Sequence, residues 1–170
     1  MASYAAVETA LARMHGADAE AQKGAFRGRI KHLQRLGLPL GEKPGKGKRI
    51  DYTDQQIWQF ALALELSEFG LDPVTIVEII MVHWDFLFGP WLEGQSESTD
   101  PHGSVLAISP YFMASNWKPL GETMGGIQSI GWRPRAGQLD TVLGNGQRRS
   151  IVIDTWAMIN QLNYHLNREE

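Results

Sequence analysis

The sequence predicts an α+β protein, in which a mainly helical N-terminal domain precedes a small domain that mixes strands and helix. Up to about residue 90, apolar residues recur every three or four positions, which is the period of amphipathic helices. Beyond residue 103, short apolar runs alternate with glycine-rich turns, which is typical of strands. We therefore expect an N-terminal domain over residues 1–90, a linker over 91–103 and a second domain over 104–170.

The composition excludes several classes of protein. The 170 residues are 43% hydrophobic and 21% charged, which is ordinary for a soluble globular protein. The chain has no cysteine, which excludes disulfides, cysteine-ligated zinc and thiol nucleophiles. The start lacks the pattern of a secretory signal, and the apolar runs are too short to span a bilayer. We expect a cytoplasmic protein, located at the nucleoid if it binds DNA, with no membrane partner.

Charge is distributed unevenly along the chain, although the formal net charge is only −3. Between Ala21 and Ile50, nine basic residues face one acid, Glu42, so this basic segment carries +8. Residues Asp51 to Asp100 contain ten acids and no Lys or Arg, so they carry −10. A dense patch of one sign on an otherwise acidic protein usually binds a polyanion. Nucleic acid is therefore the expected partner.

Two helices are predicted in the first forty residues. An apolar stripe from Tyr4 to Met14 predicts the first helix, which His15 and Gly16 end. The second helix is expected over Glu20–Leu36, with Asp18 as its N-cap. Gly37 and Pro39 then end it.

The second helix has an apolar face and a basic face. The apolar face is formed by Phe26, Ile30, Leu33 and Leu36. About 100° away lies a ladder of cations at i, i+4 spacing, namely Lys23, Arg27, Lys31 and Arg35. Like charges at this spacing repel, and Gly24 and Gly28 each cost about 1 kcal/mol relative to alanine. Such local conflict often marks a functional surface, and a solvated basic face is the alternative.

The basic segment continues into a glycine- and lysine-rich stretch, Leu40 to Arg49. This composition favours a tight β-hairpin with projecting cations over a flexible loop. Ile50 to Tyr52 then alternate as a short strand.

Two further helices have clear start signals. Thr53 and Gln56 form a capping box for a helix from Asp54 to about Phe69, and Tyr52 can pack on Ile57. Asp72 and Pro73 begin the next helix, as N-cap and first residue. That helix ends near Phe88, and its apolar positions are Val74, Val77, Ile80, Met81 and Trp84.

The second domain is expected to contain four strands and a closing helix. The strands are Val105–Ile108, Ile127–Trp132, Leu139–Leu143 and Arg149–Ile153, with a hairpin turn at Gly144–Gly146 between the last two. Asp154 caps a helix from Thr155 to about Leu166. Its apolar side consists of Trp156, Ile159, Leu162 and Leu166.

The order of these elements resembles the MerR-type winged helix-turn-helix. Ile30–Leu38 is similar to the end of that family's recognition helix, and Arg49–Thr53 to the end of its basic wing. Phe69–Ile80 is similar to the break between the two helices that follow. The resemblance covers roughly Val7 to Trp84, half of the chain.

The chain also departs from the family's pattern. His32 and Leu33 stand where the family has two aromatics, and the usual short turn between the first two helices is absent. No metal-binding cysteine set and no long coiled-coil helix follow. The DNA-binding module is therefore the part that the resemblance implies, whereas metal sensing and the family's mode of dimerisation are not implied.

The resemblance implies that the second helix enters the major groove and that the wing contacts the flanking backbone. Arg27 and Lys31 are the candidates for base contacts, because these residue types pair with guanine, and Gln34 is a candidate reader of adenine. Lys23 and Arg35 are expected to bind phosphates. The candidate DNA-binding residues of the wing are Lys43, Lys46, Lys48 and Arg49.

Four further residues in or after the basic segment are expected to have roles within the fold rather than in DNA binding. Arg29 lies near the apolar stripe of the second helix, so we expect it to be a structural or rim residue. Glu65 and Glu68 are alternative partners for the basic helix. Tyr52 is expected to pack in the core rather than donate to a phosphate.

We find no constellation typical of an enzyme. The five histidines are scattered, and His83 with Asp85 is only a weak metal pattern. The serines lack a nucleophile elbow, and the glycine-rich stretches lack the lysine of a phosphate loop. We expect no catalysis, no metal and no cofactor.

The sequence thus predicts a sequence-specific transcriptional regulator that binds double-stranded DNA. A homodimer is expected because helix-turn-helix readers generally need two half-sites, and RNA polymerase is a further candidate partner. The second domain, with Trp117, Trp132 and Trp156, is expected to dimerise or to bind an effector. Its closing helix is a candidate dimer interface, with core packing as the default explanation. The alternatives are an excisionase-like architectural or recombination accessory protein of a mobile element, and a protein-binding adaptor.

Overall fold

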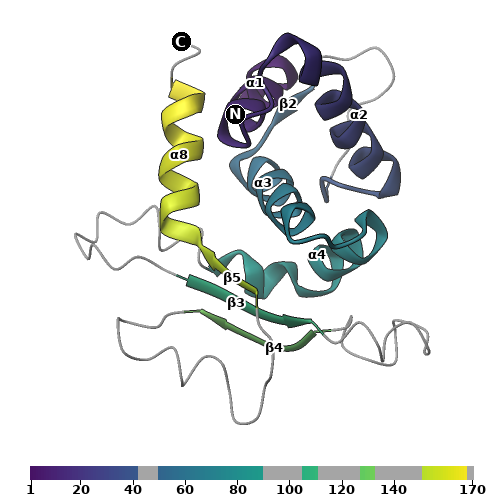
Figure 1. Ribbon diagram of the computed structural model, residues 1–170. Coiled ribbons are helices and arrows are strands. Elements are labelled where there is room, and N and C mark those ends of the chain that lie inside the picture. The colour runs from purple at the N-terminus through teal and green to yellow at the C-terminus, as the bar shows by residue number, and fades with distance from the viewer. Residues whose placement is uncertain (42–49, 90–104, 111–126, 133–150, 168–170) are drawn as a thin grey trace. The chain divides into compact units, whose positions relative to one another are not determined.

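The computed structural model describes residues 1–41, 50–89, 105–110, 127–132 and 151–167 (Figure 1). These residues form five helices and two small sheets, so the protein is of mixed helix and sheet and mostly helical, as the α+β class predicts. The chain divides into two compact units, Met1–Val77 with Asn160–Glu170, and Glu78–Ile159. The predicted linker over 91–103 lies outside the described residues, so the domain boundary stays a prediction.

The first unit begins with strand β1 (Ala2–Ser3) and helix α1 (Tyr4–Met14). The hydroxyl of Ser3 caps the helix by accepting a hydrogen bond of 3.3 Å from the amide of Ala6. Val7, Ala10 and Leu11 are buried, which confirms the predicted apolar stripe. The helix ends at His15, as predicted.

Helix α2 spans Glu20–Leu36, the predicted range, and buries Phe26, Ile30 and Leu33. Its N-cap is Ala19, with no side-chain capping bond, so the predicted cap at Asp18 is wrong. The helix begins one residue too late for the carboxylate of Asp18 to occupy the capping position. At the other end, Gly37 adopts a φ of 125°, a left-handed conformation that favours glycine.

Strand β2 (Asp51–Tyr52) pairs with β1 in antiparallel register, with Ala2 opposite Tyr52. Beyond the strands, the amide of Tyr4 donates a 3.1 Å hydrogen bond to the carbonyl of Ile50. The short strand was predicted, but its pairing with the first residues of the chain was not.

Helix α3 (Asp54–Glu68) begins with the predicted capping box. The hydroxyl of Thr53 accepts from the amide of Gln56, and the side chain of Gln56 accepts from the amide of Thr53. The helix is buried on nearly every side, and Trp58 and Phe60 are fully buried. Tyr52 packs its ring edge-on against Phe60 at 5.5 Å between ring centres, so the predicted core role of Tyr52 is confirmed.

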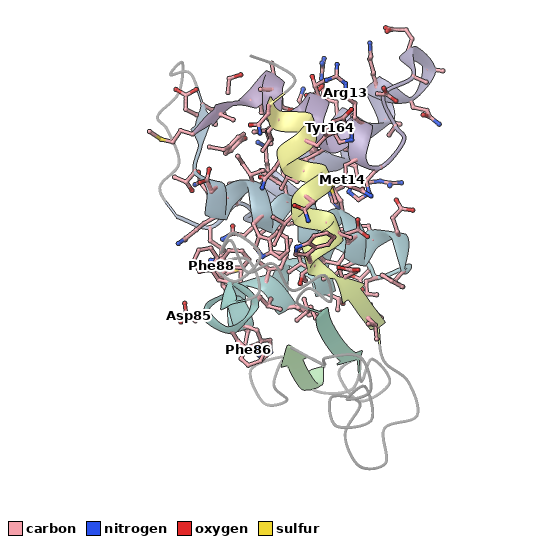
Figure 2. All side chains as sticks on the ribbon, turned by 90° about the vertical axis from the view of Figure 1, so that its left-hand side faces the viewer. Arg13, Met14, Asp85, Phe86, Phe88 and Tyr164 are labelled. Carbon is pink, nitrogen blue, oxygen red and sulfur yellow. The ribbon has the colours of Figure 1, made fainter. Side chains whose placement is uncertain are left out.

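Helix α4 (Pro73–Leu87) starts at the predicted cap, because the carboxylate of Asp72 accepts from the amides of Val74 and Thr75 at 3.1 and 3.0 Å. Of the apolar positions, Val77 and Ile80 are buried, whereas Val74 and Met81 are 50% and 55% exposed. The spacing of apolar residues does not identify the buried face of α4, because apolar residues occupy both of its faces. Its exposed apolar residues are Val74, Met81, Val82 and Phe86, of which Phe86 is labelled in Figure 2.

The second unit contains an antiparallel sheet of three strands, β3 (Val105–Pro110), β4 (Ile127–Trp132) and β5 (Ile151–Asp154). Their order is β4-β3-β5, so the first strand is central, with Leu106 opposite both Trp132 and Ile153 (Figure 1). Three of the four predicted strands are thereby confirmed. The predicted strand at Leu139–Leu143 and the turn at Gly144–Gly146 lie outside the described residues.

Helix α8 (Thr155–Asn167) follows β5 directly and is capped by Asp154, whose carboxylate accepts from the amide of Ala157 at 2.9 Å. Ile159 and Leu162 are buried, which confirms the default explanation of core packing. Trp156, the first residue of the predicted apolar side, is 39% exposed, whereas Met158 is buried. In the part of the chain that the structure describes, no helix is both long enough and apolar enough to cross a membrane.

Candidate nucleic-acid interface

The basic face of α2 lies at the surface, and all four cations of the ladder are exposed: Lys23, Arg27, Lys31 and Arg35. Gly24 and Gly28 lie beside them. Among the described residues, and apart from the backbone of α2 itself, a Cβ built at either glycine would meet no atom within 4 Å, so no described neighbour requires a glycine there. The face is therefore cationic, and at two positions it lacks side chains.

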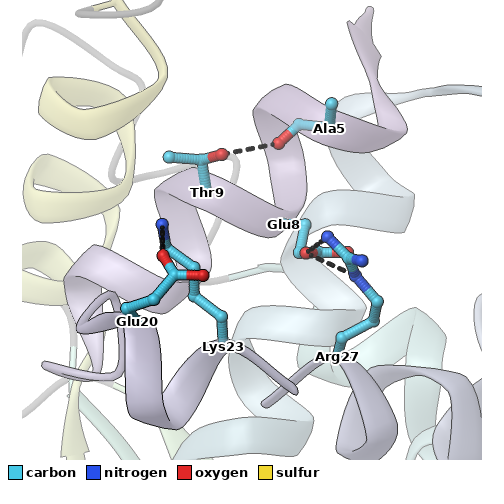
Figure 3. A network of polar contacts seen from close by, with 6 residues as sticks. All are labelled: Ala5, Glu8, Thr9, Glu20, Lys23 and Arg27. Carbon is cyan, nitrogen blue, oxygen red and sulfur yellow. Dashed lines mark hydrogen bonds and ion pairs between the residues drawn. The ribbon is translucent and has the colours of Figure 1, made fainter. Parts of the chain in front are cut away.

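Arg27 is held by Glu8 of α1 (Figure 3). Its Nε donates to Oε1 and Oε2 of Glu8 at 2.9 and 3.1 Å, and its Nη2 lies 2.8 Å from Oε1. The Glu8 side chain is only 13% exposed, whereas that of Arg27 is 56% exposed. The hydrogen bond with Glu8 raises the pKa of Arg27, so the guanidinium stays charged.

Two further cations of α2 have acidic partners. Lys23 pairs with Glu20 at 2.8 Å, one turn away on the same helix, and both side chains are exposed. Arg29 lies 3.5 Å from Glu68 of α3, one of the two acids expected as alternative partners of this helix, and both side chains are exposed. Exposed pairs of this kind contribute little to stability, so the pair with Glu20 leaves Lys23 of the ladder available to a ligand.

Lys31 and Arg35 are the remaining cations of the ladder. Arg35 donates to the backbone carbonyl of Lys31 at 3.4 Å. Among the described residues, neither side chain forms an ion pair with a carboxylate. These two are the cations of α2 with the fewest internal ties.

Gln34 is tied into the fold rather than free. Its Nε2 donates to the hydroxyl of Tyr52 at 2.7 Å, and the side chain of Gln34 is half-buried. Burial raises the pKa of Tyr52, and the hydrogen bond from Gln34 opposes that rise. The bond joins α2 to β2 across 18 positions of the sequence, and nothing in the sequence indicates it.

The residues that flank 42–49 are fixed by hydrogen bonds. On the N-terminal side, the amide of Leu40 donates to Oε1 of Gln59 at 2.6 Å, and Nε2 of Gln56 donates to the Leu40 carbonyl at 3.3 Å. On the C-terminal side, the carbonyl of Ile50 accepts from Tyr4, and β2 pairs with β1. Both ends are thus held in the unit that carries α2.

The four predicted DNA-binding residues of the wing, Lys43, Lys46, Lys48 and Arg49, lie outside the described residues, so the hairpin stays a prediction. The structure brings Lys23, Arg27, Lys31 and Arg35 together on one helix face and places Gln34 against Tyr52. Sequence reasoning missed Glu8, Gln56 and Gln59 as residues that fix these elements.

Within the described ranges, no group of three His, Asp or Glu side chains could hold a metal ion. Comparison of the chain with protein-family models, with curated proteins and with solved structures finds no match. The MerR-type resemblance therefore stays a prediction.

Proposed function

We propose that this protein is a sequence-specific transcriptional regulator that binds double-stranded DNA through a winged helix-turn-helix module. The observation that carries the proposal is the exposed cation ladder of α2, together with the fixed ends of the basic stretch 42–49 in the same unit. Two cationic elements anchored in one compact unit suit a duplex better than a single charged run on a solvated face.

The dimensions of α2 suit the major groove. A helix with its side chains is roughly 10–12 Å wide, and the groove is about 12 Å wide. From Lys23 to Arg35 the ladder rises by roughly 18 Å, at 1.5 Å per residue. That length equals about five base-pair steps of 3.4 Å.

The contacts within the fold suggest a division of roles. Lys31 and Arg35 have no described acidic partner and are our foremost candidates for DNA contacts, joined by Arg27 and Lys23. Gln34 would have to give up its hydrogen bond to Tyr52 in order to read adenine, so we assign it to bracing. Lys43, Lys46, Lys48 and Arg49 remain the proposed phosphate contacts of the wing.

The test is a titration of a labelled 30-base-pair duplex, followed by fluorescence anisotropy at several salt concentrations. If six to eight cations contact phosphates, affinity falls by about 10³ or more between 50 and 200 mM salt. Lys31→Ala lowers the affinity and reduces the slope of log K against log salt by about 1. Arg29→Ala is the matched control, because it removes the same charge from the same helix outside the ladder.

An affinity that does not change with salt concentration would overturn the proposal. Equal losses of affinity in Lys31→Ala and Arg29→Ala would also overturn it. The homodimer is tested on the same DNA by footprinting. Two protected half-sites with their centres about 34 Å apart, or a multiple of that, indicate a two-fold symmetric reader. Clustered direct repeats would instead favour the architectural alternative.

A further inference from the structure

We propose that Glu8 is a positioning residue that fixes the outward edge of Arg27 for reading a base in the major groove. This inference rests on the proposed function and adds a residue outside the basic segment to it. Glu8 belongs to α1 and is negatively charged, whereas the side chains that contact a polyanion are usually positive.

The geometry of the pair separates the two edges of the guanidinium. Nε and Nη2 of Arg27 are held by the carboxylate of Glu8 at 2.8–3.1 Å. A guanidinium has five N–H donors in a rigid fork, so the two donors of Nη1 and one of Nη2 remain outside this contact. That free edge still presents two parallel donors, which can pair with the O6 and N7 acceptors of guanine.

The burial of Glu8 favours an ion pair with Arg27 that persists when DNA binds, rather than one that breaks. The side chain of Glu8 is 13% exposed, so its carboxylate is largely shielded from water. If Arg27 left to bind a phosphate, the Glu8 carboxylate would give up charge-assisted contacts of 2.8–3.1 Å, which is unfavourable. Arg27 therefore stays paired and presents its outer edge.

The position of Glu8 is itself fixed. One turn before it, Tyr4 lies against Tyr52 with 6.3 Å between ring centres, and the amide of Tyr4 is bonded to Ile50. One residue before it, Val7 is buried in the core. A side chain held on such a base restricts the rotamers of Arg27 before DNA binds, which reduces the entropy lost on binding.

The experiment measures how well the protein discriminates sequences. A duplex library of random sequence is first enriched with the full chain. The discrimination ratio is then the affinity for the enriched duplex divided by the affinity for a random duplex. Glu8→Gln lowers this ratio about tenfold, the value of one well-oriented bidentate base contact, while it raises the affinity for random duplex.

Two matched variants separate positioning from charge. Glu20→Gln removes the same charge beside the same ladder but touches Lys23 rather than Arg27, so it raises random-duplex affinity and keeps the ratio within about twofold. Glu8→Asp keeps the charge but shortens the side chain, so it lowers the ratio without raising random-duplex affinity. Arg27→Lys loses the fork and lowers the ratio like Glu8→Gln, and the double variant shows no further loss.

An unchanged ratio in Glu8→Gln overturns the inference while the proposed function stands. A drop of equal size in Glu20→Gln also overturns it, because the effect would then be one of charge. If the unaltered chain binds no duplex at all, the proposed function itself fails, and that result is obtained before any variant is made. Thermal unfolding of each variant confirms that it folds.

Discussion

The side-chain amide of Gln34 donates a 2.7 Å hydrogen bond to the hydroxyl of Tyr52. This bond joins the C-terminal half of α2 to strand β2, which follows the basic stretch 42–49 in the sequence. Tyr52 is 3% exposed and packs against Phe60 of α3, so the anchor point belongs to the core. The bond therefore joins α2 to a buried residue of the core through two neutral side chains.

Tyr52→Phe removes the acceptor of that bond and leaves the half-buried amide of Gln34 without it. We expect a loss of about 1 kcal/mol in the free energy of unfolding, measured by urea denaturation. Adding Gln34→Leu to this variant removes the second polar partner and should restore part of the loss. Full additivity of the two substitutions would contradict a direct interaction.

Thr53→Ala removes the hydroxyl that caps α3. The expected cost is about 1 kcal/mol, within the usual range of roughly 0.5–2 kcal/mol for such caps. Thermal unfolding should show a lower midpoint for this variant. Thr53→Ser keeps a capping hydroxyl and serves as the control with a midpoint close to that of the unaltered chain.

Gly24→Ala and Gly28→Ala test whether the bare positions of α2 serve stability or binding. Because an added Cβ meets open space at both positions, each substitution should stabilise the protein by about 1 kcal/mol. On duplex DNA we expect weaker binding, since the methyl groups would stand between the helix and the groove. Gly70→Ala is the contrasting control, because its φ of 83° makes alanine destabilising there.

Glu65 provides a pH-dependent prediction. Burial, and next to it the charge of Glu68, raises the pKa of Glu65, so the folded protein holds this proton more tightly than the unfolded chain does. The favourable contribution is complete below the unfolded pKa and is lost as pH rises through the folded pKa. Glu65→Gln should therefore raise the unfolding temperature at pH 7, and the gain should disappear near pH 3. A gain of equal size at both pH values would contradict the assignment.

Local signals in the sequence predicted much of the fold. The bounds of α2 follow from its apolar stripe and from Gly37, and the starts of α3, α4 and α8 follow from Thr53, Asp72 and Asp154. Each signal acts within a few residues, where capping and period are decisive. The facing of α4 was not predictable, because apolar residues occupy both of its sides.

The contacts that build the candidate site were not predictable from one sequence. Glu8 and Arg27 are 19 positions apart, and Gln34 and Tyr52 are 18 apart. Both pairs depend on the angle at which α1, β2 and α2 meet, which no local pattern encodes. The cation ladder could be recognised in the sequence because all its members lie on one helix. Glu8, which contacts Arg27, lies on another helix and could not.

The pairing of β1 with β2 has a consequence for synthesis. Ala2 and Ser3 leave the ribosome long before their partners Asp51 and Tyr52, and domains form as the chain emerges at roughly 5–20 residues per second. For several seconds, therefore, β1 has no strand to pair with. During that time the segment between the two strands is not held by the β1–β2 pairing.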